Sequence, residues 1–120
     1  MKGIGIDLCS VERMQKMKEA FFDRFYTQEE REYLKSRGQS APESAAAMFA
    51  AKEAFLKAVG TGIGRGVELS EIGVSHTEYG APVYVLGEKA QEALHERGAS
   101  QAFLSLTHES GIAAAVCVIE

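Results

Sequence analysis

The chain contains little cysteine, because Cys9 and Cys117 are its only two cysteines. They form no CxxC pair and no ligand cluster, which argues against a zinc site and against a disulfide scaffold. We therefore interpret them as two reduced thiols, which are typical of a protein in the cytoplasm.

Long apolar runs are also missing from the sequence. No run approaches the roughly 18 apolar residues that a membrane-spanning helix needs, so we expect no membrane partner. At the N-terminus, Asp7 interrupts the apolar residues after a few positions. This stretch is too short for a signal peptide and predicts a first strand instead.

An excess of positive charge is absent as well. The net charge is -4 at pH 7, whereas a general nucleic-acid binder usually needs a basic face. We therefore expect no nucleic-acid partner, although a local basic patch is compatible with this balance.

The sequence has no internal repeat, low-complexity segment or linker. Its 120 residues predict a single domain, residues 1–120. Hydrophobic residues make up 46% and charged residues 25%, which is ordinary for a soluble globular protein with a core of its own.

Periodicity and turn residues predict alternating strands and helices. Strands are expected at residues 3–8, 67–76, 83–86, 101–108 and 112–119. Helices are expected at residues 11–25, 27–36, 40–59 and 87–98. A hairpin is expected at Glu109-Ser-Gly111, between the last two strands.

Two capping boxes are predicted at helix starts, one from Thr27 to Glu30 and one from Ser40 to Glu43. The longest helix is expected to end at Gly60, where the glycine-rich stretch Gly60 to Gly66 begins. This stretch follows a helix and so lacks the context of a nucleotide-binding loop. We interpret its glycines as a helix cap and a turn.

The last predicted strand, residues 112–119, is apolar on both faces. A strand with one wet face would alternate between apolar and polar residues. We therefore expect both of its faces to be covered, either by helices of the same chain or by another subunit.

Few single residues point to chemistry by their position alone. Asp7 at a strand end is compatible with a metal ligand, but more often such a residue caps a helix or faces water. Glu53 and Lys57 lie one helical turn apart, as in many exposed ion pairs, while Lys52 is expected to point about 100° away. His108 ends a strand, but no nucleophile elbow accompanies it, so a catalytic triad is not indicated.

Taken together, three segments resemble the holo-[acyl-carrier-protein] synthases of the 4′-phosphopantetheinyl transferase family. The segments are Gly3-Ile-Gly-Ile-Asp-Leu8 with Val11-Glu-Arg13, Phe49-Ala-Ala-Lys-Glu-Ala-Phe-Leu-Lys-Ala58 with Gly60-Thr-Gly62, and Leu104-Ser-Leu-Thr-His108 with the alanine-rich Ile112 to Val116. Their order and spacing agree with the family over nearly the whole chain. Met48 departs from it, because members often carry a basic residue there, and one contact to a coenzyme phosphate is therefore in question.

The resemblance implies an α+β fold, with an antiparallel sheet packed with a long central helix. It also implies a homotrimer in which each active site lies in a cleft between two subunits. The implied reaction transfers the 4′-phosphopantetheine group of coenzyme A to a serine of apo acyl carrier protein. It requires Mg²⁺ and releases adenosine 3′,5′-bisphosphate.

The family roles transfer to a small set of residues. Asp7 and Glu53 would hold Mg²⁺, and Glu53 and Lys57 would be catalytic, Lys57 by meeting a phosphate oxygen or protonating the leaving group. His108, Lys57 and Gly60 would contact coenzyme A. The base that takes the serine proton is left open between Glu53, Asp7 and a metal-bound water.

The helix predicted at residues 11–25 is the expected carrier-protein surface. Arg13 and Arg24 would meet carboxylates of an acidic carrier, while Met17 and Phe21 would supply apolar contacts. The same apolar residues are equally typical of a core, with the charges merely solvated.

Two other functions are compatible with parts of the pattern. One is a non-catalytic module that binds coenzyme A or a carrier protein, which would not need both acids. The other is a magnesium-dependent nucleotide phosphohydrolase, which would transfer to water and need no carrier. The carrier protein, the tolerance for acylated coenzyme A and the choice between Mg²⁺ and Mn²⁺ are not specified by the sequence.

Overall fold

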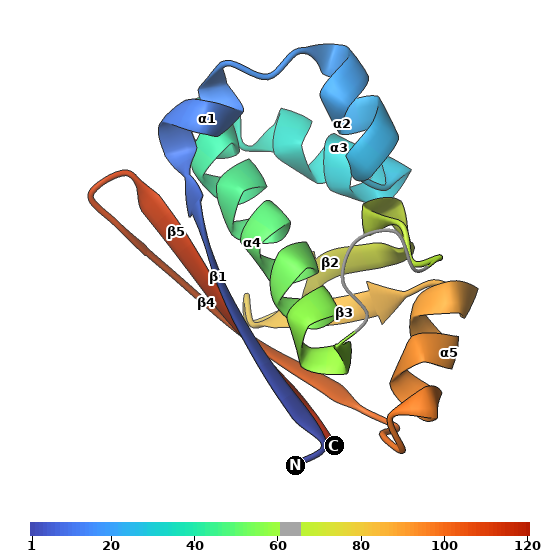
Figure 1. Ribbon diagram of the computed structural model, residues 1–120. Helices are drawn as coiled ribbons and strands as arrows, with labels where there is room; N and C mark the ends of the chain where they lie inside the picture. Colours follow the sequence, from blue (N-terminus) through green and yellow to red (C-terminus); the bar gives the residue numbers. More distant parts are fainter. Residues whose placement is uncertain (61–65) are drawn as a thin grey trace.

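A computed structural model describes residues 1–60 and 66–120 (Figure 1). The strands are β1 (Gly3–Ser10), β2 (Ile72–His76), β3 (Pro82–Leu86), β4 (Ala102–Glu109) and β5 (Ile112–Ile119). The helices are α1 (Val11–Gln15), α2 (Glu19–Phe25), α3 (Gln28–Ser36), α4 (Ala41–Val59) and α5 (Glu88–Glu96), with 3₁₀ turns at Gly38–Ser40 and Leu69–Glu71. Among the described residues, no helix has the length and apolarity of a membrane span.

The strands form two antiparallel sheets around the long helix α4. One sheet has the order β1-β5-β4, and the other pairs β2 with β3. Helix α4 lies across one face of the three-stranded sheet, and α1 to α3 gather around its N-terminal half (Figure 1). The predicted α+β fold, with an antiparallel sheet packed with a long central helix, is confirmed.

Strand β1 lies unusually close to α4, because glycines occupy two positions on the strand face that meets the helix. A Cβ atom at Gly5 would overlap the backbone oxygen of Ala54, and one at Gly3 would overlap that of Ala58. Successive residues of a strand alternate between faces, so Asp7 lies on the same face, directly after these glycines. The close contact therefore sets the distance of Asp7 from α4.

The opposite face of this sheet is left largely uncovered by the residues that the structure describes. Ile4, Ile6 and Leu8 of β1 are 57%, 63% and 65% exposed, and Phe103 of β4 is 50% exposed. In β5, by contrast, the side chains that face α4 are buried, and those of the outer face are half-buried or exposed. Helices of the same chain thus cover only one face of the last strand.

A fully buried ion pair joins α3, α4 and β2. The ammonium Nζ of Lys52 lies 2.6 Å from Oε1 of Glu30, and it also donates to the carbonyl oxygens of Leu69 and Ile72 at 3.2 and 2.8 Å. Oε2 of Glu30 accepts the amide of Val74 at 2.9 Å. Burial lowers the pKa of Lys52, and the charge of Glu30 opposes this shift. Lys52 points away from Glu53, as predicted. Its side chain enters the core.

Several predicted element boundaries are confirmed. Thr27 and Glu30 form the capping box at the start of α3, with hydrogen bonds of 3.0 and 2.8 Å in the two directions. Gly60 ends α4 with a φ of 74°. The β4–β5 hairpin turns at Ser110 and Gly111, whose φ angles are 52° and 80°. Residues 61–65 of the glycine-rich stretch lie outside the described residues.

Three predicted elements were wrong in part. The helix expected at residues 11–25 is divided into α1 and α2, because Lys18 is extended and starts a new helix. The capping box at Ser40 does not form, because the preceding 3₁₀ turn already holds Ser40 in a helical conformation. The strand expected from Val67 begins only at Ile72, after the second 3₁₀ turn.

The close contact between β1 and α4 predicts a strong effect of Gly5→Ala. We expect the variant to lose about 3 kcal/mol of stability, because the added methyl group meets backbone rather than a movable side chain. Urea unfolding monitored by circular dichroism would measure this loss.

Gly80→Ala is the matched control, since Gly80 has a φ of 87° but no atom within 4 Å of an added Cβ. It should cost only about 1 kcal/mol of conformational strain. Equal losses in the two variants would contradict the packing argument.

Candidate active site

Asp7 and Lys57 meet where β1 crosses α4. Nζ of Lys57 lies 3.1 Å from Oδ1 of Asp7 and donates to the carbonyl oxygen of Ile6 at 3.0 Å. The Asp7 side chain is 20% exposed and that of Lys57 is 55% exposed. The lysine is therefore held beside the carboxylate while it stays open to solvent.

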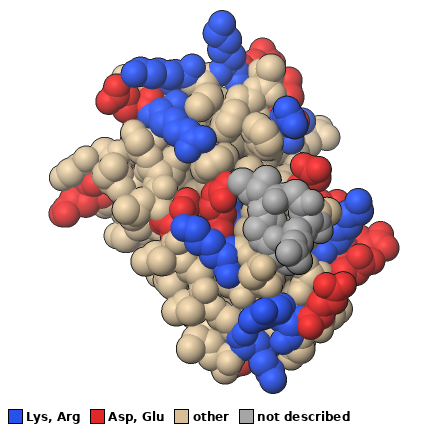
Figure 2. Space-filling model, viewed as in Figure 1, with Lys and Arg blue, Asp and Glu red and all other residues tan. Residues whose placement is uncertain are grey.

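Glu53 lies one turn before Lys57 on α4, on the same side of the helix. Burial raises the pKa of its carboxyl group most, and the charge of Asp7 raises it further, while Lys57 and Arg13 lower it. Asp7, Glu53 and Lys57, which the family resemblance assigned to one site, thus form one charged cluster. Figure 2 shows acidic and basic side chains adjoining near the middle of the face that it draws.

The two carboxylates suit a hard cation. The described residues include no group of three or more His, Cys, Asp or Glu side chains that could hold a metal ion. Mg²⁺, however, is commonly bound through one or two carboxylates together with substrate phosphates and waters. Asp7 and Glu53 supply this donor set, whereas a structural zinc site needs four ligands.

The predicted partner residues divide between surface and core. Arg13 is exposed, and its Cζ atom lies 4.8 Å from the centroid of the Phe49 ring. Arg24 is also exposed, with its Cζ atom 5.1 Å from the Phe25 centroid. Met17 and Phe21 are half-buried and pack against the core.

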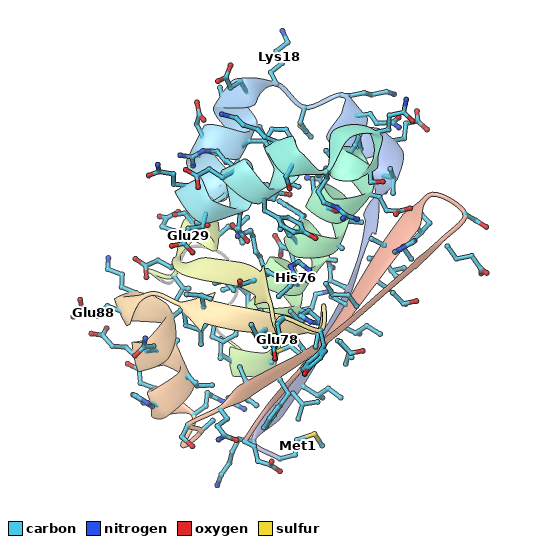
Figure 3. All side chains as sticks on the ribbon, turned by 180° about the vertical axis from the view of Figure 1, so that it is seen from behind. Met1, Lys18, Glu29, His76, Glu78 and Glu88 are labelled. Atoms are coloured by element: carbon cyan, nitrogen blue, oxygen red, sulfur yellow. The ribbon has the colours of Figure 1, made fainter. Side chains whose placement is uncertain are left out.

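The α1–α2 region carries further basic charge at its outer end. Figure 3 labels Lys18, which projects away from the body of the molecule at the turn between the two helices. Lys16 at the end of α1 is paired with Glu12 at 3.0 Å. The basic side chains therefore spread over both short helices.

His108 lies apart from the charged cluster. Its Nδ1 atom is 3.2 Å from Oε2 of Glu43, and both side chains are exposed. Glu43 precedes Glu53 along α4 by about 15 Å at 1.5 Å per residue. Within the described part of the chain, no hydrogen bond or ion pair joins His108 to Asp7, Glu53 or Lys57.

Gly60 and Met48, the other two positions that the resemblance connects with the coenzyme, differ in their surroundings. Gly60 lies at the C-terminal end of α4, and a Cβ atom there would come 3.4 Å from the guanidinium of Arg97. Met48 is only 2% exposed. A buried methionine side chain of this kind offers no charge and no hydrogen-bond donor to a phosphate.

The sequence reasoning missed two features of this site. It did not use Gly3 and Gly5, although glycines at alternate strand positions indicate close backbone contact. It assigned Arg13 only to the partner surface, whereas the charge of Arg13 also acts on Glu53. No sequence signal indicated the second feature, because Arg13 and Glu53 lie on different helices.

Comparisons with known proteins agree with this arrangement. The family model of the 4′-phosphopantetheinyl transferase superfamily matches residues 3–117. A holo-[acyl-carrier-protein] synthase of Treponema denticola is 45% identical over 120 residues, which cover 98% of this chain and 97% of that protein.

Solved structures give the same result. The crystal structure of holo-[acyl-carrier-protein] synthase from Neisseria meningitidis has a TM-score of 0.90 and 37% identity, covering 100% of this chain and 98% of that chain. A holo-(acyl-carrier-protein) synthase from Bacillus anthracis, solved in complex with CoA (3′,5′-ADP), has a TM-score of 0.83 and 36% identity. This match covers 98% of this chain and 95% of that chain.

These matches span almost the whole chain and include all three sequence motifs. The family predicted from the motifs is confirmed. The chain belongs to the 4′-phosphopantetheinyl transferase superfamily and is a transferase of the holo-[acyl-carrier-protein] synthase type.

Proposed function

We propose that this chain transfers the 4′-phosphopantetheine group of coenzyme A to a serine of an acyl carrier protein. The observation that carries the proposal is the cluster in which Lys57 joins Asp7 beside Glu53. The Treponema and Neisseria relatives carry the name of this activity, and the Bacillus relative was solved with the coenzyme. Residues 1–120 would form one domain with this activity. A location in the cytoplasm stays a prediction.

In the proposed reaction, the serine oxygen attacks the phosphorus that carries the pantetheine arm. A bond forms from the serine oxygen to this phosphorus, and the bond from the same phosphorus to the bridging oxygen breaks. Adenosine 3′,5′-bisphosphate leaves with the bridging oxygen. Because negative charge grows on the phosphoryl oxygens and on the leaving phosphate, positioned positive charge does most of the catalysis.

Asp7 and Glu53 would hold Mg²⁺ together with the pyrophosphate of the coenzyme. When bound, the cation neutralises charge on the phosphates and aligns them for attack. Lys57 reaches into the same space, where its ammonium stabilises a phosphate oxygen or protonates the leaving group. Glu53 and Asp7 are the candidate protein bases for the serine proton, with a metal-bound water as the alternative.

The coenzyme contacts are proposed at Lys57, Gly60 and His108. His108 pairs with Glu43 rather than with the acid cluster, and we propose that it contacts a coenzyme bound to a neighbouring subunit. The uncovered apolar face of the β1-β5-β4 sheet offers the surface for such an assembly. We propose a homotrimer with each active site shared between two subunits.

The carrier surface is proposed on α1 and α2. Arg13 and Arg24 are exposed there, and Met17 and Phe21 are half-buried on the same two helices or the turn between them. Because the chain has a net charge of -4, an acidic carrier needs such a local basic surface to approach it.

One experiment tests the activity. The protein is mixed with coenzyme A, Mg²⁺ and an apo acyl carrier protein, and the carrier is weighed by mass spectrometry. We expect it to gain one phosphopantetheine group. Release of adenosine 3′,5′-bisphosphate without modified carrier would indicate a phosphohydrolase, and no reaction at all would indicate a binding module.

Removing either acid should stop the transfer. We expect Asp7→Asn and Glu53→Gln, which keep the side-chain shape, to lower kcat at least about a hundredfold while circular dichroism stays unchanged. Chelator should abolish turnover of the parent protein, and Mg²⁺ should restore it. Glu92→Gln on the exposed face of α5 serves as the control. Full activity of both site variants would remove the metal hypothesis.

Neutralising Lys57 should affect chemistry more than binding. We expect Lys57→Gln to lower kcat about a hundredfold, with less than a threefold change in KM for the carrier. Steady-state kinetics with varied carrier would measure both constants. If only the carrier KM rises, Lys57 belongs to the partner surface and another cation must serve the chemistry.

The uncovered sheet face should hold the subunits together. Sedimentation should give a mass near three times 13.0 kDa for the parent protein. Ile6→Lys should give an inactive monomer, because it places a charge in the apolar interface. Val85→Lys puts the same charge at an exposed valine outside this sheet and should leave the assembly intact. An active, stable parent monomer would refute the trimer.

A further inference from the structure

The contact between Arg13 and Phe49 connects two parts of the molecule that have different proposed roles. Arg13 lies on α1, in the proposed carrier surface, and Phe49 lies on α4. The guanidinium carbon is 4.8 Å from the ring centroid, within the range of a cation–π interaction. The contact thus joins residues that are far apart in the sequence.

Phe49 also belongs to the stripe of α4 that carries the charged cluster. Phe49, Glu53 and Lys57 follow one another at intervals of one helical turn on one side of the helix. The ring of Phe49 therefore lies at the end of the cluster that faces α1. The effect of the Arg13 charge on the pKa of Glu53 agrees with this placement.

Phe49 is itself held rigidly. It is only 7% exposed, and its ring centroid lies 5.8 Å from that of Phe21. Arg24 makes a different kind of contact, because its ring partner Phe25 is the next residue in the same helix. Of the two arginines of the proposed carrier surface, only Arg13 is thus fixed by a ring on the helix that carries Glu53.

We propose that Phe49 is a positioning residue for the transfer reaction, which holds the guanidinium of Arg13 at the edge of the Asp7–Glu53 site. A carboxylate of the carrier protein would dock on this guanidinium next to the reacting serine. Arginine has many rotamers, and holding it in place before binding lowers the entropy cost of docking. This inference rests on the proposed function.

A double-mutant cycle tests the proposal. Phe49→Leu is made in the parent protein and in an Arg13→Gln background, and kcat and KM are measured for the carrier and for coenzyme A. We expect Phe49→Leu to raise the carrier KM about three- to tenfold in the parent protein. In the Arg13→Gln background the same change should alter it less than about twofold. KM for coenzyme A should stay nearly constant in all four proteins.

Three further proteins control for loss of packing. Phe49→Tyr keeps a ring under the guanidinium and should retain most of the affinity for the carrier. Phe22→Leu changes a half-buried aromatic side chain of α2 that lies under no arginine of the described residues, and its effect should be the same in both backgrounds. If Phe49→Leu does not fold, Phe49→Met, which nearly keeps the side-chain volume, takes its place in the cycle.

The outcomes separate the positioning role from the activity itself. Equal effects of Phe49→Leu in both backgrounds, with an active parent protein, would overturn the positioning role alone. A parent protein that modifies no carrier would overturn the proposed function, and the positioning role with it.

Discussion

The site depends on how closely β1 can approach α4. Gly3 and Gly5 have no side chains to separate the strand from the carbonyl groups of the helix. The next residue on the same strand face, Asp7, therefore comes within 3.1 Å of Lys57, one helical turn after Glu53. Any larger residue at the two glycine positions would lift the strand and move one carboxylate away from the other.

A second constraint holds the remainder of the fold against the same helix. The buried pair of Lys52 and Glu30 satisfies polar backbone groups of Leu69, Ile72 and Val74. A buried ammonium and carboxylate are costly to desolvate, but here each is fully hydrogen-bonded. At adjacent positions, helix α4 thus directs Lys52 into the core and Glu53 toward the charged cluster with Asp7 and Lys57.

Charges of alternating sign run along the exposed side of α4. The order begins with Arg13 over the ring of Phe49, continues with Glu53 and ends with Lys57 beside Asp7. Each carboxylate therefore lies next to a cation. This order leads from the proposed carrier surface to the proposed phosphate site. The uncovered sheet face lies on the other side of β1, because side chains of a strand alternate. The same strand can therefore serve the cleft with Asp7 and an assembly surface with Ile4, Ile6 and Leu8.

Local patterns in the sequence were sufficient to predict the Thr27 capping box, the Gly60 helix end and the hairpin at Ser110, because each depends on neighbouring residues. The family and the α+β class followed instead from the resemblance of three segments spread along the chain. The spacing of Glu53 and Lys57 placed them on one side of a helix. The resemblance paired Asp7 with Glu53 as metal ligands. The sequence did not predict the ion pair of Asp7 with Lys57 or that of Lys52 with Glu30, because each joins segments distant in the chain. It also did not predict the division of the helix at Lys18. Only the tertiary structure decided these, since the contact distances are set by glycine positions and burial rather than by local preference.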